Sequence, residues 1–157
     1  MNPLKEIRQT LIRTELKRKY KSRIIIGKDF RVRRRFTCLI RDAKLEIGDH
    51  VSFNNDCSIT VLGSVSIGSE TIFGENVRIY DHNHSFKKND GLIRTQLMSI
   101  GKVSIGNNCW IGSNVTILKG AQIGDGCVIG AGCVINGYIP AGSIVRNKQE
   151  LDIEPIK

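Results

Sequence analysis

The sequence lacks an apolar run of about 18 residues, which excludes an uncharged helix long enough to cross a bilayer. It also lacks a signal-peptide pattern at its N-terminus and a C-x-x-C pair among its five cysteines. Unpaired cysteines without a secretion signal predict a cytoplasmic protein. The missing C-x-x-C pair argues against a structural zinc site. At 157 residues the chain has the length of a single domain.

Positive charge is concentrated at the N-terminal end. Residues 1–41 contain 14 Lys or Arg and three acidic residues, whereas residues 42–157 contain ten Lys or Arg and twelve acidic residues. Four arginines lie within the segment 31–35. The basic residues lack interleaved aromatics and a nucleic-acid-binding motif, so we expect no nucleic-acid partner.

Apolar residues near the N-terminus follow helical spacing and predict an amphipathic helix over 3–21. These residues are Leu4, Ile7, Leu11, Ile12 and Leu16. Two roles stay open for the helix. It caps the open end of the domain that follows, or it contacts an anionic membrane surface or a polyanionic glycan.

A six-residue repeat dominates the rest of the chain. From Ile105 to Ile135 an aliphatic residue recurs at every sixth position for five steps, which matches neither a helix nor an alternating strand. This is the period of a β-solenoid. If three repeats form one triangular coil, stacked coils bury the aliphatic positions in a continuous core. We therefore predict an all-β solenoid, a left-handed parallel β-helix of hexapeptide repeats.

The same register occurs earlier in the chain, with a degenerate first coil starting near Ile26. The step from Ile79 to Ile105 is 26 residues, which predicts one further 18-residue coil and a protruding loop of about eight residues within 81–102. The predicted organisation is a basic helical segment over 1–24, a β-helix over 25–145 that carries the loop 81–102, and a tail over 146–157.

Two positions of the repeat carry small residues. Glycine at the second position suits either a positive φ or a close backbone approach. The fifth position points inward near a corner and often holds cysteine, which we interpret as reduced, buried apolar filler. The cysteines at this position are Cys57, Cys109, Cys127 and Cys133.

The only polar interruption of the repeat contains two of the three histidines, His82 and His84. A neutral imidazole accepts a proton from a hydroxyl near neutral pH, and Asp81 or a backbone carbonyl would orient one ring. A polar exposed turn is the alternative. A metal site that also uses His50 fits the spacing poorly, so we expect no metal.

The hexads, the segment 81–84 and the segment 105–113 together resemble the hexapeptide-repeat acyltransferases, in particular the sugar O-acetyltransferase branch that includes galactoside and maltose acetyltransferases. The resemblance spans about residues 45–145. It implies direct transfer of an acetyl group from acetyl-CoA to a sugar hydroxyl. It also implies a homotrimer whose active sites, with the coenzyme, lie at the seams between subunits.

The resemblance implies roles for individual residues. His84 precedes Ile105 by 21 residues, the spacing of the family's general base, and His82 is the second choice. The backbone N–H of Ser113 would stabilise the oxyanion. Asn54 would hold the sugar, with Asn55 as the alternative. Two further residues are expected beside the acceptor: Tyr80 and Asp81.

The coenzyme contacts follow the family only in part. Trp110 would lie against the pantetheine arm, and Ser113 and Ala131 stand where family backbone groups meet it. The family's C-terminal Pro-Ala-Lys is missing after the last coil. Arg146 and Lys148 are the candidates to replace it at the coenzyme's phosphates.

We therefore expect an acetyl-CoA-dependent O-acetyltransferase acting on a saccharide, in cell-surface polysaccharide biosynthesis. The cytoplasmic enzyme would meet membrane-associated or anionic glycans through its basic N-terminus. One alternative is the same chemistry on a sugar amine, serine or a xenobiotic. The other is a non-catalytic or metal-binding β-helix protein.

Overall fold

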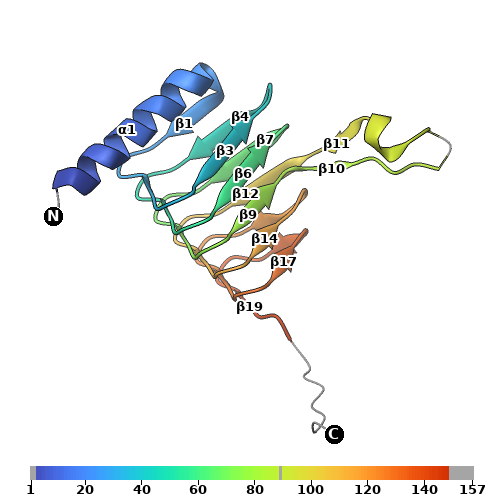
Figure 1. The fold of residues 1–157 in the computed structure, drawn as a ribbon. Helices are drawn as coiled ribbons and strands as arrows, with labels where there is room; N and C mark the ends of the chain where they lie inside the picture. The colour runs from blue at the N-terminus through green and yellow to red at the C-terminus, as the bar shows by residue number, and fades with distance from the viewer. Residues whose placement is uncertain (1–2, 89, 149–157) are drawn as a thin grey trace, which may run out of the picture.

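The chain forms a three-sided parallel β-helix capped by one helix, as shown by a computed structural model that describes residues 3–88 and 90–148 (Figure 1). Each of the first five coils contributes one short strand to each of three faces, and the last coil contributes a strand to two of them. Over the described residues, the stacked faces are parallel sheets of six, six and five strands. The predicted fold class is therefore confirmed.

The strands of each face stack in chain order. Face 1 consists of β1 (Ile24–Ile26), β4 (Lys44–Ile47), β7 (Ser64–Ile67), β12 (Lys102–Ile105), β15 (Gln122–Ile123) and β18 (Tyr138–Ile139). Face 2 consists of β2 (Arg31–Val32), β5 (Ser52–Phe53), β8 (Ile72–Phe73), β13 (Trp110–Ile111), β16 (Val128–Ile129) and β19 (Ile144–Val145). Face 3 consists of β3 (Thr37–Ile40), β6 (Ser58–Val61), β9 (Arg78–Tyr80), β14 (Thr116–Ile117) and β17 (Val134–Ile135).

The register aligns the repeated aliphatic residues in columns inside the prism. On face 1, Ile47 pairs with Ile67, and Ile67 pairs with Ile105. All three side chains are buried. Each buried aliphatic side chain stabilises the fold by about 1.5–3 kcal/mol relative to exposure, so the stacked columns form the core.

The corners of the prism explain the glycines of the repeat. The left-handed backbone falls on the fourth position, for example at Asn114 with φ 59°. The second position instead needs close approach, because a Cβ on Gly112 would lie 2.7 Å from the Ala131 nitrogen of the next coil. Of the two roles expected for this glycine, the structure supports the second.

Helix α1 (Pro3–Tyr20), followed by the short helix η1 (Lys21–Arg23), lies across the open end of the first coil (Figure 1). Gln9 Nε2 donates to the Val32 carbonyl at 2.8 Å, and the Val32 N–H donates to Gln9 Oε1 at 2.9 Å. Ile12 and Leu16 pack against the core. The helix therefore covers apolar surface and satisfies the backbone of the edge strand β2. In the part of the chain that the structure describes, no helix is long and apolar enough to cross a membrane.

The interruption between faces 3 and 1 is larger than expected. It holds β10 (His82–His84), η2 (Ile93–Thr95) and β11 (Met98–Ile100), and β10 and β11 form an antiparallel hairpin that projects from the prism (Figure 1). Ile79 and Ile105 therefore flank a single corner, and the further coil predicted between them is wrong. One coil earlier the same corner takes a step of only eight residues, from Ile59 to Ile67. The step of 26 residues from Ile79 to Ile105 therefore contains an insertion of 18 residues, which is the length of one coil.

The five cysteines are free. Cys57, Cys109, Cys127 and Cys133 are buried at inward corner positions, as expected for small apolar filler. Cys57 Sγ lies 3.1 Å from the Gly74 carbonyl of the next coil. Burial raises the pKa of the Cys57 and Cys109 thiols, so these side chains stay protonated.

Candidate active site

The base of the hairpin holds a carboxylate and an imidazole in contact. The Asp81 side chain is fully buried, and it accepts hydrogen bonds from the backbone N–H groups of Leu62 at 2.9 Å and Gly63 at 2.7 Å. Its Oδ1 also lies 3.0 Å from His82 Nδ1. A carboxylate at this distance favours a proton on Nδ1, so the Nε2 of the neutral ring is left as the basic nitrogen.

These contacts change the role expected for Asp81. A fully buried carboxylate that binds backbone N–H groups of the preceding coil is not available to an acceptor sugar, so its interpretation as an acceptor-binding residue does not fit the structure. Asp81 instead positions His82. The sequence suggested that Asp81 orients one of the histidines, but it did not show that Leu62 and Gly63 fix the carboxylate.

The other residues of the interruption are more exposed. His84 pairs with Met98 in the hairpin, and its side chain makes no hydrogen bond or ion pair within the described residues. Tyr80 lies at the end of β9 with its ring edge-on to His82, at a centroid distance of 6.2 Å. The imidazole of His82 is 14 % exposed and oriented, whereas that of His84 is exposed and unpaired.

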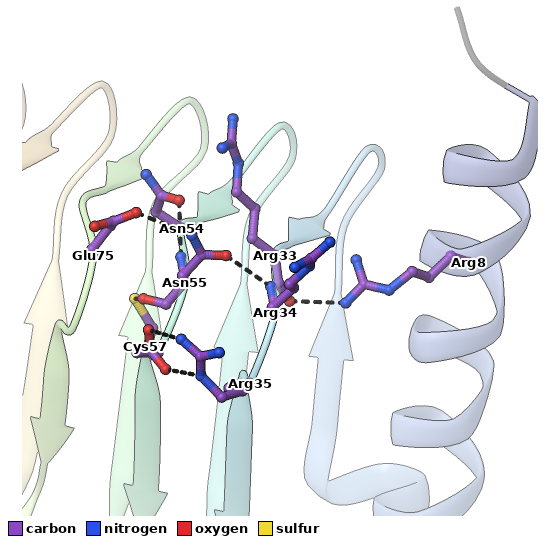
Figure 2. Close-up of polar contacts among 9 residues, drawn as sticks. Arg8, Arg33, Arg34, Arg35, Asn54, Asn55, Cys57 and Glu75 are labelled. Carbon is purple, nitrogen blue, oxygen red and sulfur yellow. Dashed lines mark hydrogen bonds and ion pairs between the residues drawn. The ribbon is translucent and has the colours of Figure 1, made fainter.

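The corner between faces 2 and 3 carries a ladder of polar contacts between coils. The Arg34 N–H donates to Asn55 Oδ1 at 3.1 Å, and the Glu75 N–H donates to Ser113 Oγ at 3.1 Å. In each case a side chain of the next coil accepts the backbone N–H of the third repeat position. Figure 2 shows the N-terminal part of this ladder, where Arg34, Asn55 and Glu75 follow one another along the corner.

The ladder stops at Ser113. The residue that faces it in the next coil is Ala131, which has no side-chain acceptor, and the backbone N–H of Ser113 has no partner within the described residues. Gly74 leaves space beside this group, because a Cβ there would lie 2.6 Å from the Ser113 nitrogen. An unpaired backbone N–H at an accessible corner is a donor for a ligand oxygen.

Two asparagines on the same corner, Asn54 and Asn55, differ in which side-chain groups remain free to bind a ligand. Asn55 uses both ends of its amide, because Oδ1 accepts from Arg34 and Nδ2 donates to Glu75 at 3.0 Å. Asn54 Oδ1 accepts the Asn55 N–H at 2.9 Å, while its Nδ2 donates to no group within the described residues. Asn54 is therefore the better candidate to bind a hydroxyl.

The residues expected at the coenzyme follow the same edge of the prism. Trp110 lies on face 2, where its side chain points outward and is 55 % exposed. Ser113 and Ala131 follow at the corner, and Arg146 and Lys148 lie exposed at its C-terminal end. The structure thus places Asn54, the Ser113 N–H and the five residues expected at the coenzyme along one edge.

The histidines lie at the opposite end of face 3. Arg78 pairs with Thr116 on this face, Ser113 lies three residues before Thr116, and His82 lies four residues after Arg78. At about 3.3 Å per residue, these seven steps separate the two groups by roughly 20 Å. A single chain therefore does not bring His82 to the Ser113 N–H.

His50 lies on the corner between faces 1 and 2, where its ring nitrogens are 3.4 Å from Asp29 and 4.0 Å from Glu70. The structure does not bring it together with the other two histidines. Within residues 3–88 and 90–148, no group of three or more His, Cys, Asp or Glu side chains could hold a metal ion.

Residues 102–137 match the bacterial transferase hexapeptide family (six repeats). The matched repeats lie in the β-helix, from strand β12 to strand β17. Over 104 residues it is 38 % identical to the putative lipopolysaccharide biosynthesis O-acetyl transferase WbbJ of Escherichia coli (strain K12), with 62 % of this chain and 53 % of the relative covered. The hexapeptide-repeat chain thus spans about half the length of this curated relative.

Solved structures share the fold. A hexapeptide-repeat containing acetyltransferase of Vibrio cholerae, VCA0836, superposes with a TM-score of 0.71 at 24 % identity over 85 % of this chain and 73 % of its own. The same protein complexed with acetyl-CoA gives a TM-score of 0.64 at 23 % identity, with coverages of 86 % and 71 %. A maltose O-acetyltransferase of Clostridium difficile 630 gives 0.68 at 24 % identity over 91 % and 83 %.

Proposed function

We propose that this protein is an acetyl-CoA-dependent O-acetyltransferase that acetylates a saccharide hydroxyl, with His82 as the general base. The observation that carries the proposal is the combination of an Asp81-oriented imidazole with an unpaired Ser113 N–H beside an exposed Trp110. A base, an oxyanion donor and an apolar surface for an acyl carrier are what acyl transfer to a hydroxyl requires.

In the proposed reaction, His82 Nε2 accepts the proton of the acceptor hydroxyl as the hydroxyl oxygen attacks the thioester carbonyl carbon. The carbonyl oxygen becomes an oxyanion, which accepts a hydrogen bond from the Ser113 N–H. Collapse breaks the carbon–sulfur bond, and the proton on His82 passes to the departing thiolate. The products are an acetyl ester and free CoA. Asp81 stabilises the transient imidazolium without touching the substrate.

The site is complete only when a second copy of the chain is present. Because His82 and Ser113 of one chain are roughly 20 Å apart, the base must meet the Ser113 edge of a neighbour. Exposed apolar side chains support such an association, since Phe86 and Leu97 on the hairpin and Ile72 and Ile144 on face 2 lie outside the core. We propose the cyclic homotrimer that the family resemblance implies.

The saccharide acceptor and its place in cell-surface polysaccharide synthesis are supported by the sequence likeness to an O-acetyl transferase named for lipopolysaccharide biosynthesis. Asn54, with its free amide nitrogen, supports a hydroxyl-bearing ligand. A cytoplasmic enzyme that meets its glycan at the inner membrane surface is consistent with this role.

The decisive experiment measures free thiol released from acetyl-CoA with a panel of sugars, sugar nucleotides, amino sugars and serine. We expect release that depends on a saccharide, and a fall of about 10²–10⁴-fold in His82→Ala. His50→Ala is the matched control and should retain wild-type turnover, because His50 lies at another corner.

The same assay separates the alternatives. Loss of turnover in His84→Ala but not in His82→Ala would identify His84 as the general base, as the family spacing predicts. Release that depends only on an amino sugar or on serine would change the acceptor class. No release with any acceptor, together with no acetyl-CoA binding by calorimetry, would refute the proposed activity.

A further inference from the structure

An open cleft lies between α1 and face 2. It has a volume of about 1050 Å³ and reaches from the helix to Trp110. Its charged lining consists of four arginines and one glutamate: Arg8, Arg31, Arg33, Arg34 and Glu6. The cleft therefore carries a net charge of +3, four positive charges less one, although most of the β-helix beyond the first coil is nearly neutral.

Most of this charge is not neutralised within the chain. Glu6 pairs with Arg31 at 3.4 Å. The side chains of Arg33 and Arg34 form no hydrogen bond or ion pair within the described residues. Like charges held close together without partners destabilise a fold, so an unneutralised group of arginines in a concave site points to an anionic ligand.

Arg8 is held in place at the cleft by backbone carbonyl groups. Its guanidinium donates to the Arg33 carbonyl at 3.0 Å and to the Val32 carbonyl at 3.4 Å. These neutral acceptors fix the position of the cation without cancelling its charge. Figure 2 shows Arg8 reaching from α1 toward the first coil, with Arg33 and Arg34 on that coil and Asn54 on the next.

The cleft is continuous with the proposed acceptor site. Asn54 on the second coil and Trp110 on the fourth line it together with the arginines of the first coil. Strands stack about 4.8 Å apart, so the first and fourth coils are separated by about 14 Å. An extended ligand can thus place a sugar near Asn54 and Trp110 and an anionic group against Arg33 and Arg34.

We propose that this cleft binds the phosphate groups of a phosphorylated saccharide acceptor. Guanidinium groups bind phosphate oxygens bidentately, and a diphosphate matches three unneutralised positive charges better than one carboxylate does. The phosphates come either from a nucleotide diphosphate sugar or from a polyprenyl diphosphate sugar. This proposal depends on the proposed function only where it calls the ligand an acceptor substrate. Binding of the phosphate groups does not require turnover.

The test measures binding by calorimetry, because a pyrophosphate held by Arg33 and Arg34 would lie about 14 Å from Trp110. The 157-residue chain is titrated with inorganic pyrophosphate, with UDP-glucose, and with phosphatidylcholine vesicles that contain a polyprenyl diphosphate sugar. We expect pyrophosphate to bind with a measurable heat. The Kd should rise at least tenfold in Arg33→Ala/Arg34→Ala and less than twofold in Arg18→Ala/Arg41→Ala, which removes the same charge outside the cleft. Tighter binding of UDP-glucose or of the vesicles identifies the source of the phosphate.

Several results would overturn the proposal. A titration with pyrophosphate that gives no heat of binding would do so, as would equal losses in the two double variants. Binding to phosphatidylglycerol vesicles without binding of pyrophosphate would make the arginines a membrane contact. If the enzyme is active, a rise in KM for acetyl-CoA rather than for the phosphorylated acceptor would assign the cleft to the coenzyme. An inactive protein that still binds pyrophosphate would refute the acetyltransferase and leave the anion site standing.

Discussion

Asp81 contacts His82 through a carboxylate that the preceding coil already holds in place. One oxygen lies 3.0 Å from His82 Nδ1, and the other accepts the Gly63 N–H at 2.7 Å. The same side chain therefore closes a corner of the prism and positions the proposed base. A rigid scaffold that also orients a reacting group limits how far the imidazole can drift from its productive geometry.

Asp81→Asn should therefore impair both stability and turnover. An amide cannot accept from Leu62, Gly63 and His82 at once, so at least one buried N–H loses its acceptor. We expect the free energy of unfolding to fall by about 1–3 kcal/mol. Urea denaturation and thiol-release kinetics measure the two effects. His82→Ala separates them, because it removes the base and leaves the Asp81–Gly63 contact intact. An equal loss of stability in both variants would contradict the dual role.

Ala131→Ser should inhibit the enzyme by completing a hydrogen bond. A hydroxyl at 131 faces the Ser113 N–H as Ser113 Oγ faces the Glu75 N–H, where the N–O distance is 3.1 Å. Once paired, the Ser113 N–H no longer serves an oxyanion, and kcat should fall by about 10²-fold. Ala141→Ser is the matched control, because Ala141 ends the corresponding ladder at the corner of faces 1 and 2. Equal activity in the two variants would exclude Ser113 as the oxyanion donor.

The thiol of Cys38 should make stability depend on alkaline pH. Burial raises its pKa from an ordinary value of 9.0 to about 12. The unfolded chain then loses this proton at lower pH than the folded protein. The stabilising contribution is complete below pH 9 and disappears as the pH rises toward 12.

Urea denaturation of wild type and Cys38→Ala between neutral pH and mildly alkaline pH checks this expectation. Both proteins should lose stability as the pH rises, because Cys57 and Cys109 also have raised pKa values. The wild type should lose stability more steeply, since it carries one additional thiol with a raised pKa. Parallel profiles would show that Cys38 titrates normally.

The hexad period predicted the coils because it reports a one-dimensional property, the recurrence of a buried position. Ile105 and Ile123 stack in consecutive coils, and so do Ile111 and Ile129, as the 18-residue spacing within this run predicts. The hairpin was misjudged for the same reason. An insertion of 18 residues between Ile79 and Ile105 preserves the phase of the repeat, so counting cannot distinguish it from a coil.

The candidate site was predictable only where contacts are local in the repeat. Ser113, Ala131 and Trp110 lie on neighbouring coils, and the family spacing brings them to one edge. The choice between His82 and His84 depends on a buried carboxylate held by Leu62 and Gly63, about twenty residues earlier. One signal was available in the sequence, since Ala131 follows polar residues at the same corner position in the four preceding coils.

Two inactive variants should complement each other if the active site spans two chains. His82→Ala lacks the base but retains the Ser113 donor, and Ala131→Ser retains the base but blocks the donor. When the two are co-expressed, an interface that takes His82 from one variant and Ser113 from the other is intact. Random assembly of a cyclic oligomer makes about one quarter of the interfaces intact.

Each mixed trimer contains one intact interface in three, so we expect the selected mixed trimers to recover about a third of wild-type turnover, whereas each variant alone is nearly inactive. Purification through a different affinity tag on each variant selects the mixed species, and sedimentation shows whether its mass is three times the 17.5 kDa of one chain. Mixed trimers without recovered activity would contradict a site shared between chains. A monomer with full activity would refute both the trimer and the division of the site, because His82 and Ser113 of one chain do not meet.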